Sequence, residues 1–215
     1  MYRGTQLTVI FLAILSISGC ATSRSIIDVP YPAADKFSPA NDKEVFIASV
    51  KDQRVFETAP REPNIPSLDP TESQNDSIRL RSIGRKRNTF GKALGDIILK
   101  EDKTVETLMA ASIRQAFIEN GYRLIDSKDK INDKTTVVDA TINKFWSWMN
   151  PGFSSITLST EIATDLSLKS AEGVTKTSIS IKNAGNYQTG MEGNWLEVLN
   201  KALQIYIDDL KTKIN

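Results

Sequence analysis

Residues 135–170 read TTVVDATINKFWSWMNPGFSSITLSTEIATDLSLKS, and this stretch decides the fold. Two long runs rich in β-branched and aromatic residues, Thr135 to Met149 and Ser154 to Ser170, lie on either side of Asn150-Pro151-Gly152. Such runs favour extended strands, and Pro followed by Gly suits the two central positions of a type II turn. The stretch therefore predicts two long strands joined as an antiparallel hairpin.

The second of these strands separates apolar from polar side chains with a period of two. One face carries Ile156, Leu158, Ile162, Leu166 and Leu168, and the other carries Thr157, Ser159, Glu161, Asp165 and Lys169. A strand with this alternation packs one face on a core and leaves the other in water. The hairpin is thus predicted to belong to a sheet that is dry on one side only.

Shorter patterns supply the remaining elements. Further strands are predicted at 44–50 (EVFIASV), 122–125 and 175–184. Apolar residues spaced by three and four predict helices over 102–120 and 194–210. The fold class we expect is α+β, with an antiparallel or mixed sheet of about five strands and two amphipathic helices packed on one face.

One long polar segment interrupts this pattern. Residues 55–78 contain Pro60, Pro63, Pro66 and Pro70. A connection of this length within a domain is either functional or disordered. We therefore expect a single domain over 44–215 that carries a mobile insertion at 55–78.

Composition removes many classes of site. The chain has 27 basic and 26 acidic residues, and Arg3 is the only charged residue before Cys20, so the chain from Cys20 carries 26 of each. Such a neutral chain has no overall field that would attract nucleic acid. It has no histidine and one cysteine, which excludes zinc sites of Cys and His, Ser-His-Asp and Cys-His catalysis, and internal disulfides. We expect neither a cofactor nor a metal.

The N-terminus has the pattern of an export signal. Residues 1–20 read MYRGTQLTVIFLAILSISGC, with Arg3 before an apolar run from Leu7 to Ile17. That run is shorter than the roughly 20 residues that span a bilayer. Residues 1–19 are therefore predicted to be a signal peptide, cleaved between Gly19 and Cys20.

The four residues Ile17-Ser18-Gly19-Cys20 resemble the lipobox of bacterial lipoproteins, which implies that the Cys20 thiol carries lipid. The alternative is cleavage elsewhere, which would leave Cys20 as a spare thiol. Several acyl chains anchor a protein stably, whereas one does so only marginally. Ala21 occupies the position where retention in the inner membrane favours Asp, so resemblance to sorted lipoproteins implies the periplasmic face of an outer membrane. Residues 20–43 are expected to be a lipidated N-terminus and flexible tether, reaching roughly 25 to 30 Å.

A basic run is the first candidate for binding a ligand. It consists of Arg79, Arg81, Arg85, Lys86 and Arg87. In an exported protein, such a patch suits anionic lipid, lipopolysaccharide or glycan. The alternative is a solvated loop.

Aromatic residues around the predicted turn are the second candidate. Trp146, Trp148 and Phe153 would form a partner surface or a membrane-touching tip if the turn were exposed. The alternative is that Trp146 and Trp148, two residues apart on one face, pack under a helix as part of the core.

Three strand carboxylates are the third candidate. Asp139, Glu161 and Asp165 could pair across strands as an acid and a base, which glycan hydrolysis requires. Carboxylates on a wet sheet face are common, so the alternative is a solvated surface.

The chain resembles the YajG family of uncharacterised bacterial lipoproteins over most of its length after Cys20. The shared features are the lipobox, the first strand running into Asp52-x-Arg54, the pair Ile83-Gly84, and the helix ending at Asn120-Gly121-Tyr122. The later hairpin, the turn at Gly173 and the C-terminal helix follow the same layout, while the insertion at 55–78 is longer than the family leads us to expect. The resemblance implies a location and a fold, and brings no activity.

We expect a non-enzymatic binding or accessory lipoprotein of the cell envelope. Its partners would be the membrane, through its acyl chains, and an envelope protein, peptidoglycan or lipopolysaccharide. Two alternatives stay open: an assembly component of a secretion, flagellar or transport machine, and a protein that binds or cleaves glycans.

Overall fold

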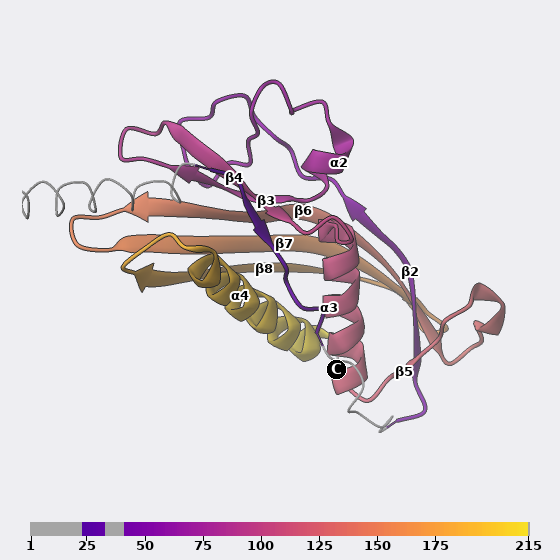
Figure 1. Cartoon of the computed structure of the whole chain (residues 1–215). Helices are drawn as coiled ribbons and strands as arrows, with labels where there is room; N and C mark the ends of the chain where they lie inside the picture. Colours follow the sequence, from indigo (N-terminus) through magenta and orange to yellow (C-terminus); the bar gives the residue numbers. More distant parts are fainter. Residues whose placement is uncertain (1–22, 33–40, 215) are drawn as a thin grey trace, which may run out of the picture.

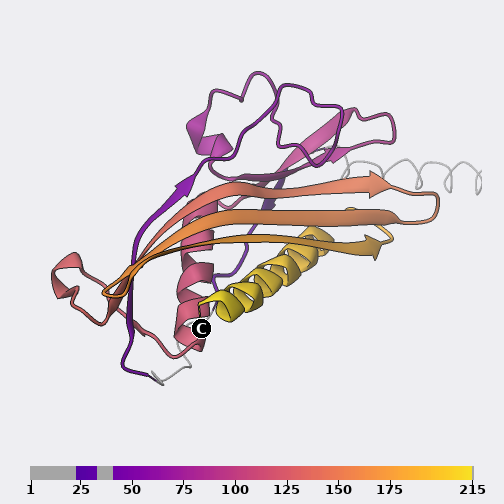
Figure 2. The ribbon, with the colours of Figure 1, turned by 180° about the vertical axis from the view of Figure 1, so that it is seen from behind.

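The computed structural model describes residues 23–32 and 41–214 of the chain. The predicted hairpin lies at the centre of its sheet: β6 (Thr135–Pro151) pairs antiparallel with β7 (Ile156–Ser170). The loop between them begins after Pro151, and Gly152 N–H donates to the Ser155 carbonyl at 2.8 Å, so the turn lies slightly later than predicted. β8 (Gly173–Tyr187) pairs antiparallel with β7 along its whole length. These three long strands curve side by side (Figures 1 and 2).

The other edge of β6 pairs with two strands in succession. β2 (Glu44–Asp52) runs parallel to the first half of β6, and β3 (Ser82–Arg87) runs parallel to its later part. β4 (Ala93–Leu99) pairs antiparallel with β3, and β1 (Ser25–Ile27) pairs parallel with β4. β5 (Arg123–Leu124) pairs with the first residues of β2. The sheet of the described residues is mixed and has eight strands, so the expected five is wrong.

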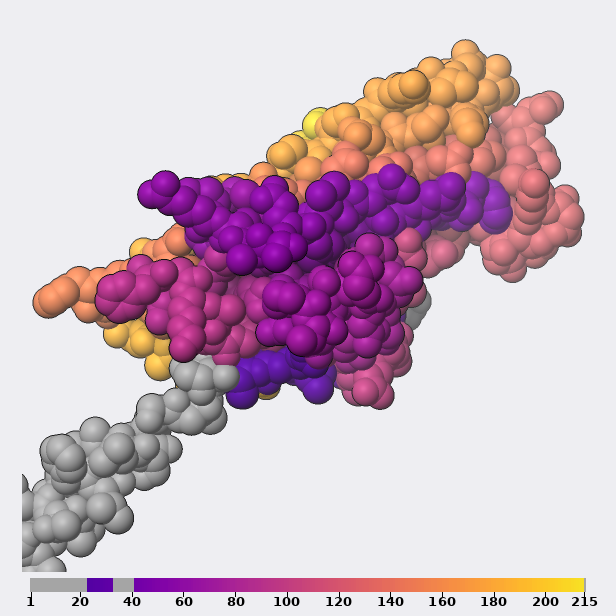
Figure 3. All heavy atoms as spheres, turned by 90° about the horizontal axis from the view of Figure 1, so that it is seen from above, coloured from indigo at the N-terminus to yellow at the C-terminus, as the bar shows by residue number. Residues whose placement is uncertain are grey.

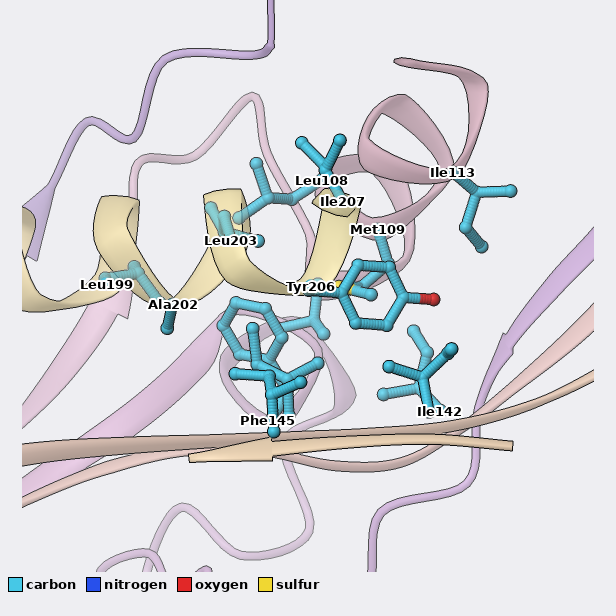
Figure 4. Close-up of a cluster of buried hydrophobic side chains, with 14 of the residues drawn as sticks. Leu108, Met109, Ile113, Ile142, Phe145, Leu199, Ala202, Leu203, Tyr206 and Ile207 are labelled. Atoms are coloured by element: carbon cyan, nitrogen blue, oxygen red, sulfur yellow. The ribbon is translucent and has the colours of Figure 1, made fainter. Parts of the chain in front are cut away.

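Two long helices cover one face of the sheet, as expected (Figure 1). They are α3 (Val105–Glu119) and α4 (Glu192–Lys213), and the described chain adds the short helices α2 (Asp76–Arg79) and η1 (Lys128–Lys130). The apolar stripes of α3 and α4 meet above the inner residues of β6 (Figure 4). The Tyr206 hydroxyl lies 2.9 Å from the Thr164 hydroxyl within this core, and burial raises the pKa of Tyr206. Among the described helices, none is both long and apolar enough to cross a bilayer.

The opposite face is partly covered by the segment 53–75, which lies on the far side of the sheet from the helices (Figure 1). Leu68 is buried, Glu57 N–H donates to the Pro66 carbonyl at 2.8 Å, and the Trp146 indole donates to the Pro63 carbonyl at 3.1 Å. The expectation of a mobile insertion at 55–78 is therefore corrected. Buried side chains of the sheet, Arg87 and Trp146, donate to the carbonyls of Pro60 and Pro63.

Candidate functional site

The first described residues, from Ser23 onward, are attached to the sheet. Gly19 and Cys20 lie outside the described residues, so the structure does not test lipidation or cleavage. From Ser23 onward the chain runs along the edge of β4, with Ser25 opposite Ile97. Ser25, Ile27 and Val29 are buried. The expected flexible tether over 20–43 is thus wrong for residues 25–29, because their alternating buried side chains complete the sheet edge and the core.

Two buried lysines hold this segment in place. Lys86 Nζ donates to the Ser23 carbonyl at 3.0 Å and to the Ser25 hydroxyl at 2.8 Å. Lys103 Nζ donates to the Val29 carbonyl at 2.6 Å and to the carboxylate of Asp28. Hydrogen bonds from Lys103 and then Lys100 lower the pKa of Asp28. Burying a lysine ammonium costs free energy unless the ammonium is hydrogen-bonded. Both lysines therefore stabilise the docked position of this segment.

Glycine at position 95 is required for this docking. Gly95 has a φ of +155°, and a Cβ added there would lie 2.4 Å from the Ser23 carbonyl oxygen. A side chain at this position would therefore push the N-terminal segment off β4.

The basic run is not an exposed patch. Arg81, Arg85, Lys86 and Arg87 are buried, and only Arg79 has a substantially exposed side chain. Arg81 Nε donates to the Leu99 carbonyl at 2.9 Å, and Arg85 Nε lies 3.1 Å from Asp96 Oδ1. The predicted anionic-ligand patch is therefore wrong, because strand pairing turns these side chains toward partners within the protein.

Arg87 shows what the basic run does instead. Its guanidinium donates to the Pro60 carbonyl at 2.6 Å and to the Ser67 hydroxyl at 2.9 Å. Burial, followed by the nearby charge of Arg85, lowers the pKa of Arg87. The guanidinium ties the segment 53–75 to the sheet.

The two tryptophans are part of the packing, as the alternative interpretation held. Trp146 is fully buried and meets Phe56 edge-on, with ring centroids 5.9 Å apart. Trp148 is 3% exposed, with Lys182 Nζ 5.2 Å from its ring centroid. They pack on the face opposite the helices, not under a helix. Only Phe153 of the predicted partner surface is exposed, and it is completely so.

The three strand carboxylates do not form an acid and base pair. Lys169 and then Ser49 hydrogen-bond to Asp139 and lower its pKa, and Ser178 and then Asn143 do the same for Asp165. Glu161 forms an ion pair with Lys144 at 2.9 Å. A general acid at neutral pH needs a raised pKa, so this arrangement does not support hydrolysis. Within the described residues, no group of three or more Asp, Glu, Cys and His is placed to hold a metal ion.

A groove beside β2 is a candidate surface for a partner. It has a volume of about 460 Å³ and lies between residues 47–50 of β2 and the exposed side of α3, with Tyr31 at one end. The Glu106 carboxylate at its rim accepts the Asp52 N–H at 2.8 Å, while Arg114 is exposed. Among the described strands, β5 alone pairs with this outer edge of β2, and it reaches only Glu44 and Val45. Sequence periodicity did not reveal this groove, because it depends on how α3 packs beside a partly unpaired strand.

Comparisons with known proteins do not identify a family. No family model matches the chain, and no curated protein matches its sequence. A solved structure of an uncharacterized protein has a TM-score of 0.48 at 8% identity, covering 90% of this chain and 99% of that one. A Xanthomonas campestris protein of family DUF330 has a TM-score of 0.44 at 13% identity, covering 88% of this chain and 91% of that one.

A minor lipoprotein from Acinetobacter baumannii has a TM-score of 0.29 at 16% identity, covering 49% of this chain and 78% of that one. Similarity at this level transfers neither family nor function, and membership of the YajG family stays a prediction.

Proposed function

We propose that this chain is a lipoprotein of the bacterial envelope, anchored through Cys20 to the periplasmic face of an outer membrane, whose domain is a non-enzymatic binding or accessory module. The observation that carries the proposal is the path of the chain next to Cys20. Ser23 is fixed to Lys86, and the strand Ser25–Ile27 is built into the sheet. A lipid on Cys20 would therefore hold the folded domain close to the membrane rather than at the end of a long tether.

The strand carboxylates are engaged in hydrogen bonds and ion pairs, which supports a binding role over a catalytic one. The carboxylates that could have acted as acid and base have lysine, hydroxyl or amide partners. The groove between β2 and α3 offers an edge of backbone groups and the exposed cation of Arg114. An unpaired strand edge can accept an extended segment of another protein, and we place the partner contact there.

Membrane anchoring is tested by fractionation of cells that express the full chain. Cys20→Ala should remove the protein from the outer-membrane fraction, so that it is found in the periplasm or as a precursor that keeps its signal peptide. The substitution should also abolish incorporation of a tagged fatty acid. Thr22→Ala is the matched control, since it alters a nearby residue and keeps the thiol. Retention of Cys20→Ala in the outer membrane at the parental level would overturn the proposal.

The binding site is tested by in-cell crosslinking from a photoreactive residue at position 114. A discrete crosslinked band is expected there and is not expected from position 176, an exposed position on β8. Equal, diffuse crosslinking from both positions would contradict the groove as the partner site.

A further inference from the structure

Three loops lie together at one end of the sheet. They are 88–92 between β3 and β4, 152–155 between β6 and β7, and 188–191 between β8 and α4. β3 and β8 both run in the direction of β6, so all three strands finish at this end. Seen from above, the β6–β7 turn projects at the same end as the β3–β4 hairpin (Figure 3). We call residues 88–92, 152–155 and 188–191 the loop end.

The loop end displays large apolar side chains to the outside. Phe153 is completely exposed, Phe90 is 93% exposed and Met191 is 64% exposed. Lys92 is the only charged residue in these three loops. Large exposed apolar side chains on loops with a single charge are typical of surfaces that contact a partner or a membrane.

The opposite end of the sheet differs in character. The connection 126–134, which leads into β6, reads DSKDKINDK and is charged at six of nine positions. Moving such a loop out of water would require desolvation of each charge. The three loops of the loop end, with one charged residue among them, can therefore enter an apolar boundary at lower cost than the connection 126–134.

The first described residue after Cys20 lies near the loop end. Ser23 contacts Gly95, two residues after the start of β4 at Ala93. Cys20 is three residues before Ser23, and three residues span at most about 11 Å. The hairpin from Gly95 to Gly91 extends about 13 Å at the rise of a strand. A chain that extends from Ser23 toward the loop end would therefore bring acyl chains on Cys20 into a bilayer whose surface is nearly level with the loop end.

We infer that the loop end rests on the membrane, with Phe90 and Phe153 inserted at the boundary between lipid headgroups and acyl chains. This inference depends on the proposed lipidation of Cys20, and it assigns a fixed orientation to the anchored domain. Apolar side chains beside an acyl anchor add a second attachment, and a second attachment strengthens membrane binding. Met191 precedes Glu192, the first residue of α4, so this part of the loop end lies at the water side of the contact.

The orientation is tested with single cysteine variants of the full, lipidated chain. Phe90→Cys and Phe153→Cys place a thiol at the loop end, and Val174→Cys places one at another exposed apolar position, near the start of β8 at the far end of the sheet. Each purified protein is labelled with an environment-sensitive fluorophore and reconstituted in phosphatidylethanolamine–phosphatidylglycerol vesicles that carry shallow nitroxide-labelled lipids. We expect blue-shifted emission and several-fold stronger quenching at positions 90 and 153 than at position 174.

The outcomes separate this inference from the proposed function. The parental protein should take up no label, because a lipidated Cys20 has no free thiol; a labelled parental protein that does not bind vesicles would overturn both proposals. Suppose that the protein binds vesicles but the labels at positions 90 and 153 are quenched no more than the label at position 174. This result would agree with the lipid anchor and would overturn the proposed orientation. Because Phe90 and Phe153 make little contact with the fold, the substitutions should leave it intact.

Discussion

Arg54 and Asp52 form a buried, two-pronged ion pair at the end of β2. Arg54 Nε donates to Asp52 Oδ1 at 2.8 Å, and Nη2 donates to Oδ2 at 2.7 Å. The same guanidinium donates to the carbonyls of Arg79, Ser82 and Phe145. It therefore fills the place where β6 changes its neighbour from β2 to β3.

Arg54→Met should destabilise the protein strongly, because Asp52 and several carbonyls would lose their partner in a buried site. Breaking a buried ion pair in this way costs about 3 to 5 kcal/mol. Urea unfolding measures the change, with Arg61→Met as a control at an exposed arginine of the same segment. Equal midpoints for the two variants would show that the guanidinium does not support this junction.

Gly95→Ala should release residues 23–29 from β4. The added Cβ meets the Ser23 carbonyl, so the N-terminal segment has to move. The Lys100 amide, which donates to the Ile27 carbonyl at 3.1 Å, should exchange with deuterium at least about tenfold faster, a local opening that leaves the rest of the fold in place.

Gly91→Ala is the matched control for this change. Gly91 also has a positive φ, but nothing lies within 4 Å of its added Cβ. Its substitution should leave exchange at Lys100 unchanged. Similar exchange in both variants would mean that the docked segment does not depend on the space at position 95.

Glu44 should make the protein more stable at neutral than at acid pH. Its buried carboxylate accepts hydrogen bonds from Arg123, Thr135 and Asn132, and these, Arg123 first, hold its pKa below the ordinary value of 4.5. A carboxyl whose pKa is lowered by folding contributes stability above its unfolded pKa, and that contribution is lost as the pH falls through the folded value.

Glu44→Gln removes this contribution, so parent and variant should differ in urea midpoint at neutral pH and converge below pH 4.5. Glu172→Gln, at an exposed position in the β7–β8 turn, is the control. A difference between parent and Glu44→Gln that stays constant as the pH falls would contradict a role for the ionised carboxylate.

Trp146→Phe should loosen the segment 53–75 without disturbing the sheet. The variant loses the hydrogen bond to the Pro63 carbonyl, which corresponds to about 1 kcal/mol. Tryptic cleavage after Arg61 should become faster. Trp148→Phe changes a neighbouring buried ring on the same face and should leave that cleavage rate unaltered. An equal increase in the cleavage rate of both variants would argue against a specific role for the hydrogen bond between Trp146 and Pro63.

Local sequence patterns predicted the part of the fold that depends on near neighbours. The strands β6, β7 and β8 and the helices α3 and α4 each bury a stripe that recurs with a regular period, so alternation and three-four spacing found them. The position of both helices on one face was also anticipated, and of the two expected sheet types, antiparallel or mixed, the structure has the mixed one.

Local patterns also predicted β2 and β5, but not β1, β3 and β4, whose pairing and burial depend on other parts of the chain. The strand β3 reads SIGRKR and has the composition of a solvated loop, yet every residue in it is buried. Its cations bind carbonyls that lie far away in the sequence, such as those of Ser23 and Pro60. The loop end was only partly predicted: Phe153 was singled out, whereas Phe90 and Met191 become its neighbours through the strand order.

The central claim is that Cys20 carries lipid, and intact-mass spectrometry of the protein extracted from membranes tests it most directly. The expected mass is that of a chain that begins at Cys20, increased by a diacylglyceryl group and an amide-linked acyl chain. The mass of a chain that begins at another residue, or of one with an unmodified Cys20, would contradict it.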